Sequence, residues 1–231
     1  MKKFRSVYVV ALALLWPLSQ AVLAAEFNHD EFNGVWRIAE PVHALRAADG
    51  SAPPLLPEAQ RIYDERRRGL EGGDRMLDRT SWCAAAGLPR LLTEAQPFEI
   101  MVDRRQVGFF FQWNRWVRLV DMSGAELELY YPLSMGIPSG KWEGDTLVVR
   151  SMGLMHETFM DASGLPHSDN LVMTERLRLR DADTLENHIH FEDPETFTRP
   201  WETVLVYKRQ HNARLREDVC LDNIKQGLPA I

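Results

Sequence analysis

Apolar and polar residues alternate along most of the chain after residue 97, and this alternation predicts a β-rich fold. An earlier run covers 34–38, and the later ones cover 98–102, 106–113, 115–120, 127–131, 146–152, 171–180, 184–192 and 201–209. Polar turn signals separate most of these runs. Short strands at regular spacing predict an antiparallel meander that closes as a barrel or a sandwich.

The region between the first predicted strand and residue 97 has a different pattern. Pro53 and Pro54 break an irregular stretch, and Pro57 then suits the first position of a helix over 57–68. Gly69 is a typical helix end. We therefore expect one domain over 25–231, mainly β, with a helical and irregular insertion after its first strand.

The N-terminal residues predict export. A basic segment at 2–5 precedes an apolar run at 7–18, and Val22 and Ala24 occupy the −3 and −1 positions of a cleavage site. The run is shorter than the roughly 18 residues of a membrane span. We expect residues 1–24 to be a signal peptide and the mature protein to be periplasmic or secreted, without stable membrane insertion.

Cleavage of the signal peptide would change the net charge, and export would place the two cysteines in an oxidising compartment. Cleavage removes three basic residues, so the net charge falls from −6 to −9, which argues against nucleic acid as a partner. Cys83 and Cys220 form an even pair in an oxidising compartment and predict a disulfide, with two free buried thiols as the alternative.

Gly34-Val35-Trp36 resembles the Gly-x-Trp that opens the first strand of lipocalin-like barrels. The resemblance implies that Trp36 plugs a closed barrel end beneath an arginine of the last strand. Arg209 lies at the end of the last predicted strand and is the candidate for this cation–π contact.

Large aromatic residues are candidates for the wall of a ligand cavity. They lie on neighbouring strands, where they either fill the core or line a space for an apolar ligand. The predicted ligand-binding residues are Trp36, Phe109, Phe111, Trp113, Trp116 and Trp201.

Glu175 falls on the apolar face of its predicted strand. Successive side chains of a strand point to opposite faces, so Glu175 shares its face with Met173 and Leu177. A carboxylate in this position is costly unless it is paired or protonated. Arg199 and Arg209 are candidate partners.

His167 and Asp169 lie in the turn-rich loop before that strand. One interpretation is a general base, His167, oriented by Asp169. The other is a loop held by Asp and Ser side chains that bond to their own backbone.

His188, His190 and Glu192 share one face of a predicted strand and are the only zinc ligands that we consider. The opposite face is the apolar one, so a metal site is disfavoured and no cofactor is expected. The stretch from Gly136 to Lys141 is one residue short of a phosphate-binding loop and is interpreted as a turn.

Several motifs resemble those of a family of exported bacterial proteins without an assigned function. They are Gly-Lys-Trp-Glu-Gly-Asp-Thr-Leu-Val-Val at 140–149, Pro-His-Ser-Asp at 166–169, Thr-Glu-Arg at 174–176, Asp-Thr-Leu-Glu at 183–186, Glu-Asp-Pro at 192–194 and Phe-Thr-Arg-Pro-Trp at 197–201. The resemblance implies an exported β-barrel-like domain, not an activity. The positions that match the shared pattern are His167, Asp169, Glu175, Glu192 and Trp201.

Three functions are compatible with these features. The first is a lipocalin-like barrel that binds a hydrophobic small molecule. The second is a cofactor-free isomerase, cyclase, hydratase or lyase that uses Glu175 and His167 as acid and base. The third is a structural or interaction protein in which Glu175 only pairs with an arginine.

Overall fold

The computed structural model describes residues 27–125, 128 and 131–230. The predicted signal peptide and most of the predicted strand at 127–131 lie outside these residues. The elements are η1 (His29–Phe32), β1 (Gly34–Ile38), α1 (Pro57–Glu71), η2 (Arg75–Leu77), η3 (Arg79–Trp82), α2 (Arg90–Thr93), β2 (Phe98–Val102), β3 (Gln106–Phe111), η4 (Trp113–Arg115), β4 (Val117–Asp121), β5 (Ile137–Glu143), β6 (Thr146–Met152), β7 (Val172–Asp181), β8 (Thr184–Glu192), β9 (Trp201–Arg209) and α3 (Cys220–Lys225).

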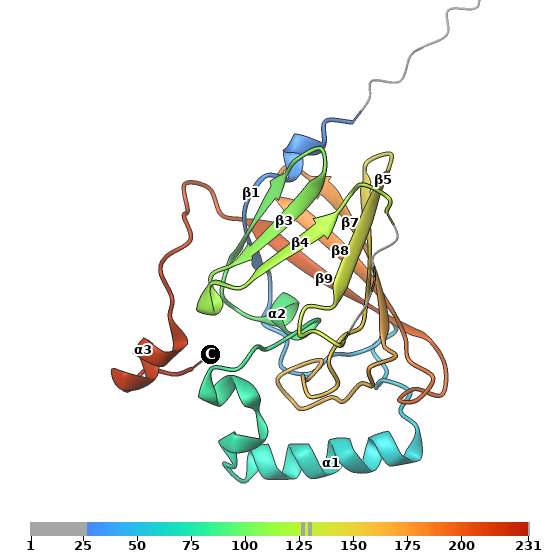
Figure 1. Ribbon diagram of the computed structural model, residues 1–231, viewed down its shortest axis with the longest axis vertical. Coiled ribbons are helices and arrows are strands. Elements are labelled where there is room, and N and C mark those ends of the chain that lie inside the picture. The colour runs from blue at the N-terminus through green and yellow to red at the C-terminus, as the bar shows by residue number, and fades with distance from the viewer. Residues whose placement is uncertain (1–26, 126–127, 129–130, 231) are drawn as a thin grey trace, which may run out of the picture.

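The strands form one closed barrel in sequence order, and β9 pairs back onto β1 (Figure 1). The neighbours are antiparallel except at one place. There, β4 and β5 meet in parallel through the single pair Asp121 and Ser139. The predicted fold class is confirmed: a mainly β, lipocalin-like barrel with a helical insertion after the first strand.

The expected turn from Gly136 to Lys141 is wrong. Most of this stretch belongs to β5, which pairs with β6 along its whole length. Pairing with a neighbour overrides the local turn signal of two glycines and a proline. Gly140 also has a packing reason, because a Cβ there would lie 2.7 Å from Val120 Cγ1 of β4.

One end of the barrel is closed as the Gly-x-Trp motif predicts. The guanidinium of Arg209 lies 4.2 Å from the Trp36 ring centroid and donates to the carbonyl oxygens of Glu31, Asn33 and Ala182. Gly34 has a φ of +133°, and a Cβ at this position would lie 2.7 Å from Arg209 Nη1. Glycine is therefore required where the arginine crosses the first strand.

The insertion between β1 and β2, which we call the cap, covers the other end of the barrel (Figure 1). Leu88, Leu91 and Leu92 of this cap are buried in the same core as the barrel residues. The Tyr207 hydroxyl of β9 donates to the Leu92 carbonyl oxygen at 2.9 Å. The cap is thus fastened to the barrel by apolar packing and a hydrogen bond.

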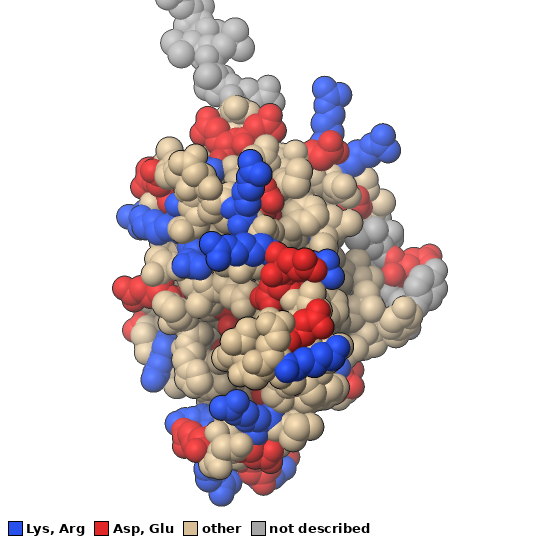
Figure 2. All heavy atoms as spheres, turned by 90° about the vertical axis from the view of Figure 1, so that its left-hand side faces the viewer, with Lys and Arg blue, Asp and Glu red and all other residues tan. Residues whose placement is uncertain are grey.

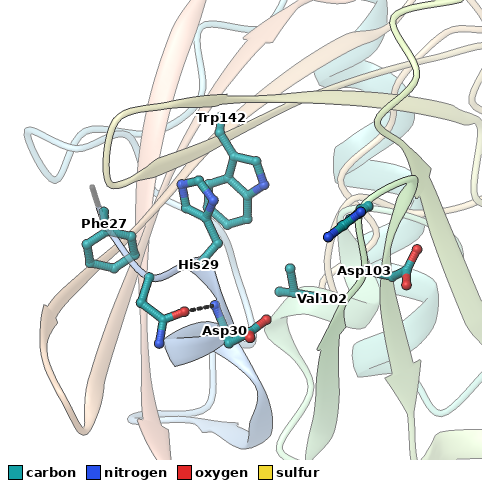
Figure 3. A pocket seen from close by; sticks show the side chains of 8 residues that line it. Phe27, His29, Asp30, Val102, Asp103 and Trp142 are labelled. Carbon is teal, nitrogen blue, oxygen red and sulfur yellow. Dashed lines mark hydrogen bonds between the residues drawn. The ribbon is translucent and has the colours of Figure 1, made fainter. Parts of the chain in front are cut away.

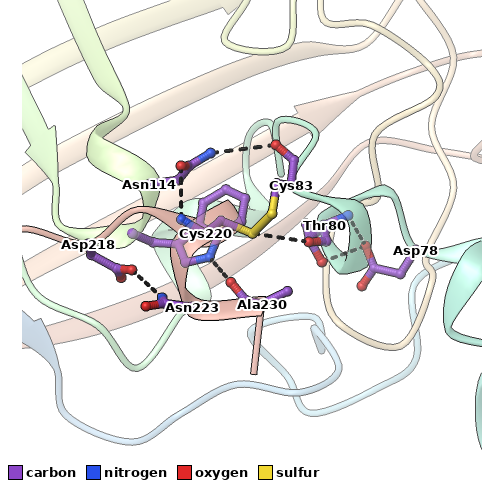
Figure 4. Close-up of a disulfide and its surroundings, with 9 residues drawn as sticks. Asp78, Thr80, Cys83, Asn114, Asp218, Cys220, Asn223 and Ala230 are labelled. Carbon is purple, nitrogen blue, oxygen red and sulfur yellow. Dashed lines mark hydrogen bonds between the residues drawn. A yellow bond between two sulfur atoms is a disulfide. The ribbon is translucent and has the colours of Figure 1, made fainter. Parts of the chain in front are cut away.

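The predicted disulfide between Cys83 and Cys220 is present and joins the insertion to α3 (Figure 4). Asn114, at the β3–β4 turn, donates to the Cys83 carbonyl oxygen and accepts from the Cys220 amide. Three segments distant in sequence are therefore tied together. Among the described residues, no helix combines the length and apolar character needed to cross a bilayer.

Candidate functional site

A group of four polar side chains, linked by hydrogen bonds, lies in the apolar interior of the described part of the barrel. Arg118 comes from β4, Ser151 from β6, Glu175 from β7 and Asn187 from β8, and none is more than 1% exposed. The cross-strand neighbours of Glu175 are Val149 and Ile189, which are also fully buried. We refer to Arg118, Ser151, Glu175 and Asn187 as the interior polar cluster.

Hydrogen bonds connect the interior polar cluster around the Glu175 carboxylate. Arg118 Nη2 forms an ion pair with Glu175 Oε2 and donates to Ser151 Oγ at 2.8 Å. Asn187 Nδ2 donates to Glu175 Oε1 at 2.9 Å. The Arg118 guanidinium also lies 5.3 Å from the ring centroid of its cross-strand neighbour Phe109.

The partner of Glu175 differs from the one expected. Arg209 is occupied by backbone carbonyl groups at the closed end of the barrel, and Arg199 is exposed in a loop. Arg118 reaches Glu175 instead, because both side chains point into the barrel. Of the two alternatives for Glu175, a paired or a protonated carboxylate, the structure shows the paired one, and the partners that we named, Arg199 and Arg209, are wrong.

Part of the hydrogen-bonding capacity of the cluster is unused. Arg118 Nε, Arg118 Nη1 and Asn187 Oδ1 are buried and have no hydrogen-bond partner among the described residues. A buried polar atom without a partner costs about 1–3 kcal/mol. Such atoms are rare in folded proteins, and each one calls for an explanation. The unpartnered donors and acceptor belong to two residues, Arg118 and Asn187, that both bond to the Glu175 carboxylate.

Tyr207 of β9 adds a hydroxyl close to this cluster. Burial raises the pKa of Tyr207 well above its ordinary value, and the Glu175 carboxylate raises it further. The hydroxyl therefore stays protonated at physiological pH. It serves as a donor, here toward the Leu92 carbonyl of the cap.

The barrel wall is weakest beside Arg118. Pairing between β4 and β5 is limited, in the described part of the wall, to Asp121 and Ser139. The peptide groups of every second residue in a strand point toward the same neighbouring strand. The peptide groups of Val117 and Leu119 therefore point toward β5, as those of Asp121 do. The side chains of Val117 and Leu119 are 42% and 50% exposed. We call this junction the β4–β5 seam.

The predicted aromatic residues separate into two groups. Trp36, Phe109, Phe111 and Trp201 are buried on barrel strands. Trp113 and Trp116 instead belong to the β3–β4 turn. The Trp113 indole donates to the Ala230 carbonyl oxygen, so Trp113 holds the C-terminal segment.

His167 and Asp169 do not contact each other through hydrogen bonds. His167 Nδ1 contacts the Ser168 carbonyl oxygen, and Nε2 contacts the Thr158 hydroxyl. Asp169 Oδ1 accepts from the backbone amide of His156 and lies 3.0 Å from its Nδ1. The pairing that we expected is therefore wrong, since the loop turns these two side chains toward different partners. His167 also shares no hydrogen-bond partner with Glu175.

The buried His167 should make stability depend on pH. Burial lowers the pKa of its imidazole below the ordinary 6.5, although the Ser168 carbonyl opposes the shift. The folded protein holds a neutral imidazole, and the unfolded chain takes up a proton near pH 6.5. The contribution to stability is therefore complete above pH 6.5 and is lost as the pH falls toward the lowered pKa.

We expect the free energy of unfolding to decline between pH 7 and 5 more steeply in the wild type than in His167→Asn. The difference in slope is at most about 1.4 kcal/mol per pH unit. Urea unfolding at a series of pH values measures it, with the exposed His156→Asn as the control. Equal slopes in the wild type and His167→Asn would contradict the assignment of a neutral buried imidazole.

His188, His190 and Glu192 lie on the outer face of the barrel, as the alternation predicts. His188 and Glu192 are exposed, and His190 Nδ1 lies 3.0 Å from Glu202 Oε1. No group of three or more potential metal ligands converges anywhere in the described part of the chain.

Two pockets lined by several charged side chains lie on the outside of the molecule. One, of about 470 Å³, borders Trp142, on whose ring His29 stacks with centroids 3.8 Å apart (Figure 3). The other, of about 400 Å³, follows the outer face of β6 to β9 and contains both Arg176 and Glu202. Basic and acidic side chains are also interspersed over the face in Figure 2. None of the described unpartnered buried polar atoms belongs to a residue that lines these two pockets.

Comparisons with known proteins do not identify a family for this chain. No protein-family model and no curated protein matches the chain. The crystal structure of a single-residue variant of the fluorescent protein UnaG is similar, with a TM-score of 0.35 and 12% identity, and the match covers 79% of this chain and 98% of that chain. At this level of similarity no function can be transferred. The resemblance to exported bacterial proteins therefore stays a prediction.

Proposed function

We propose that the protein binds a small, predominantly apolar molecule inside the barrel, with the interior polar cluster as its anchor. The observation that carries this proposal is the set of unpartnered atoms on Arg118 and Asn187. A ligand with one polar group in an otherwise apolar skeleton would satisfy these atoms. Apolar lining with a few convergent polar groups is the usual composition of small-molecule sites.

The surroundings of the cluster suit such a ligand. Phe109 lies against the Arg118 guanidinium, and Val149 and Ile189 flank Glu175. Aromatic rings and branched aliphatic side chains offer large apolar contact areas. The polar group would give orientation, and the apolar contacts would give most of the affinity.

We propose that binding requires the barrel to open, because the residues around the cluster, such as Phe109, Val149 and Ile189, are fully buried. The β4–β5 seam supplies the place, since its ladder consists of one residue pair and Arg118 lies on the strand that forms its edge. A wall with few backbone hydrogen bonds opens at a lower free energy than a fully paired one. We expect the ligand to enter here and to meet Arg118 first.

Acid–base catalysis by Glu175 and His167 is not part of the proposal. The two residues have no common hydrogen-bond partner, and the Glu175 carboxylate is engaged by Arg118 and Asn187. A purely structural barrel is the outcome against which the proposal is tested.

Native mass spectrometry of the protein from its own host, beside the denatured mass, tests the proposal directly. We expect a discrete organic increment that disappears on denaturation. Nile red, a neutral apolar dye, should also bind and be displaced by the released compound. Neither an increment nor saturable dye binding would leave a structural barrel as the explanation.

A matched pair of variants locates the site. Asn187→Leu removes the unpartnered oxygen at similar volume, and we expect it to weaken ligand binding at least tenfold. Arg176→Gln changes a half-exposed residue next to Glu175 in sequence, on the outer face, and should leave affinity unchanged. Equal affinities in the two variants would place the ligand elsewhere.

A further inference from the structure

The charges inside the barrel cancel. Among the buried side chains of the described strands, Arg118 and Glu175 are the ones that carry a charge. They form an ion pair with each other. The interior polar cluster therefore has unused hydrogen-bonding capacity but no net charge.

The hydrogen-bonding groups without a partner include both donors and an acceptor. Arg118 Nε and Nη1 are donors, and Asn187 Oδ1 is an acceptor. A ligand carboxylate would satisfy the donors, but it has no hydrogen for Asn187. It would also bring a second negative charge near Glu175, with only one guanidinium to balance the two. Burying an unbalanced charge is far more costly than burying a neutral polar group.

We propose that the barrel selects uncharged apolar ligands in which a carbonyl oxygen lies beside an N–H or O–H group, as in amides, lactams and hydroxy ketones. Glu175 is the specificity-determining residue, because it cancels the charge that would otherwise attract a carboxylate. This inference rests on the proposed function and names the ligand class of the same site. It excludes the anionic form of fatty acids and aromatic acids as the preferred ligands.

The test compares acids with their primary amides, which differ in charge and share the apolar skeleton. The probes are naphthalene-2-carboxylate, octanoate and dodecanoate, each with its amide, in competition with Nile red at pH 8. We expect the amide of the best-binding pair to bind at least tenfold more tightly than the acid. An acid that binds as tightly as its amide, or more tightly, would overturn the inference and leave the proposed function intact.

Substitution of Glu175 provides the second measurement. In Glu175→Gln the guanidinium loses its counter-charge, so the preference should move at least tenfold toward the acid. Glu202→Gln, on the outer face, should leave it unchanged. An unchanged preference in folded Glu175→Gln would also overturn the inference. If this variant does not fold, the wild-type comparison decides alone.

Failure of the inference and failure of the proposed function give different results. Should no member of any pair displace Nile red, and should the native mass carry no increment, the binding function itself is wrong. Saturable binding without discrimination against the acids contradicts only the ligand class.

Discussion

Arg118→Met is expected to lower the free energy of unfolding by about 3–5 kcal/mol, the usual cost of removing one partner of a buried ion pair. The variant would leave the Glu175 carboxylate in the barrel with Asn187 as its remaining side-chain donor. Glu175→Met should cost a similar amount, because it leaves the guanidinium without its counter-charge. Urea unfolding followed by circular dichroism measures both values.

The double variant Arg118→Met/Glu175→Met separates the cost of breaking the pair from the value of having it. Replacing both charges by apolar side chains of similar size is often close to neutral. We therefore expect the double variant to be more stable than either single variant, with a coupling energy of about 2 kcal/mol or more. Additive losses would show that the two residues contribute through packing rather than through their charges.

The same experiment tests whether the cluster is retained for stability or for binding. A double variant as stable as the wild type, but without ligand binding, would mean that the charged pair contributes little to folding. The unpartnered nitrogens of Arg118 favour this outcome, because a cluster built only for stability would satisfy them.

Two of the four residues of the interior polar cluster, Glu175 and Asn187, can be assigned to the barrel interior from the alternation of their strands. Glu175 is on the apolar side of a strand with clean alternation, and Asn187 shares its phase with Leu185 and Ile189, so the same argument applies to it. Arg118 was hidden, because its neighbours Val117 and Leu119 are apolar and yet face outward. The pattern there indicates the wrong face, and only closure of the barrel reveals the right one.

Contacts made through loops were less predictable than the strands. The bounds of β1, β6, β8 and β9 follow from alternation and turn signals alone. The partner of Asp169 depends on the path of a loop that brings His156 back to it, and no local pattern encodes that path. Likewise, β5 is defined by its pairing with β6 rather than by its own residues.

Replacing both Cys83 and Cys220 by serine is expected to produce the other large loss of stability. The bridge spans 137 residues, and for a loop of this length the chain-entropy model gives about 5 kcal/mol as an upper value. Urea unfolding of the double serine variant against the oxidised wild type measures the loss. Single substitutions are unsuitable, because they leave a free thiol.

The loss should have a local component that fluorescence can detect. The bridge fixes α3, and the Trp113 indole holds the chain end through the Ala230 carbonyl oxygen. Without the bridge, we expect this end to detach before the barrel unfolds, with a shift of tryptophan emission at urea concentrations where circular dichroism is unchanged. Trp113→Phe in the serine background should abolish the early shift. Coincident transitions in that background would instead mean that the C-terminal segment and the barrel unfold as one cooperative unit, since independent probes then report the same equilibrium.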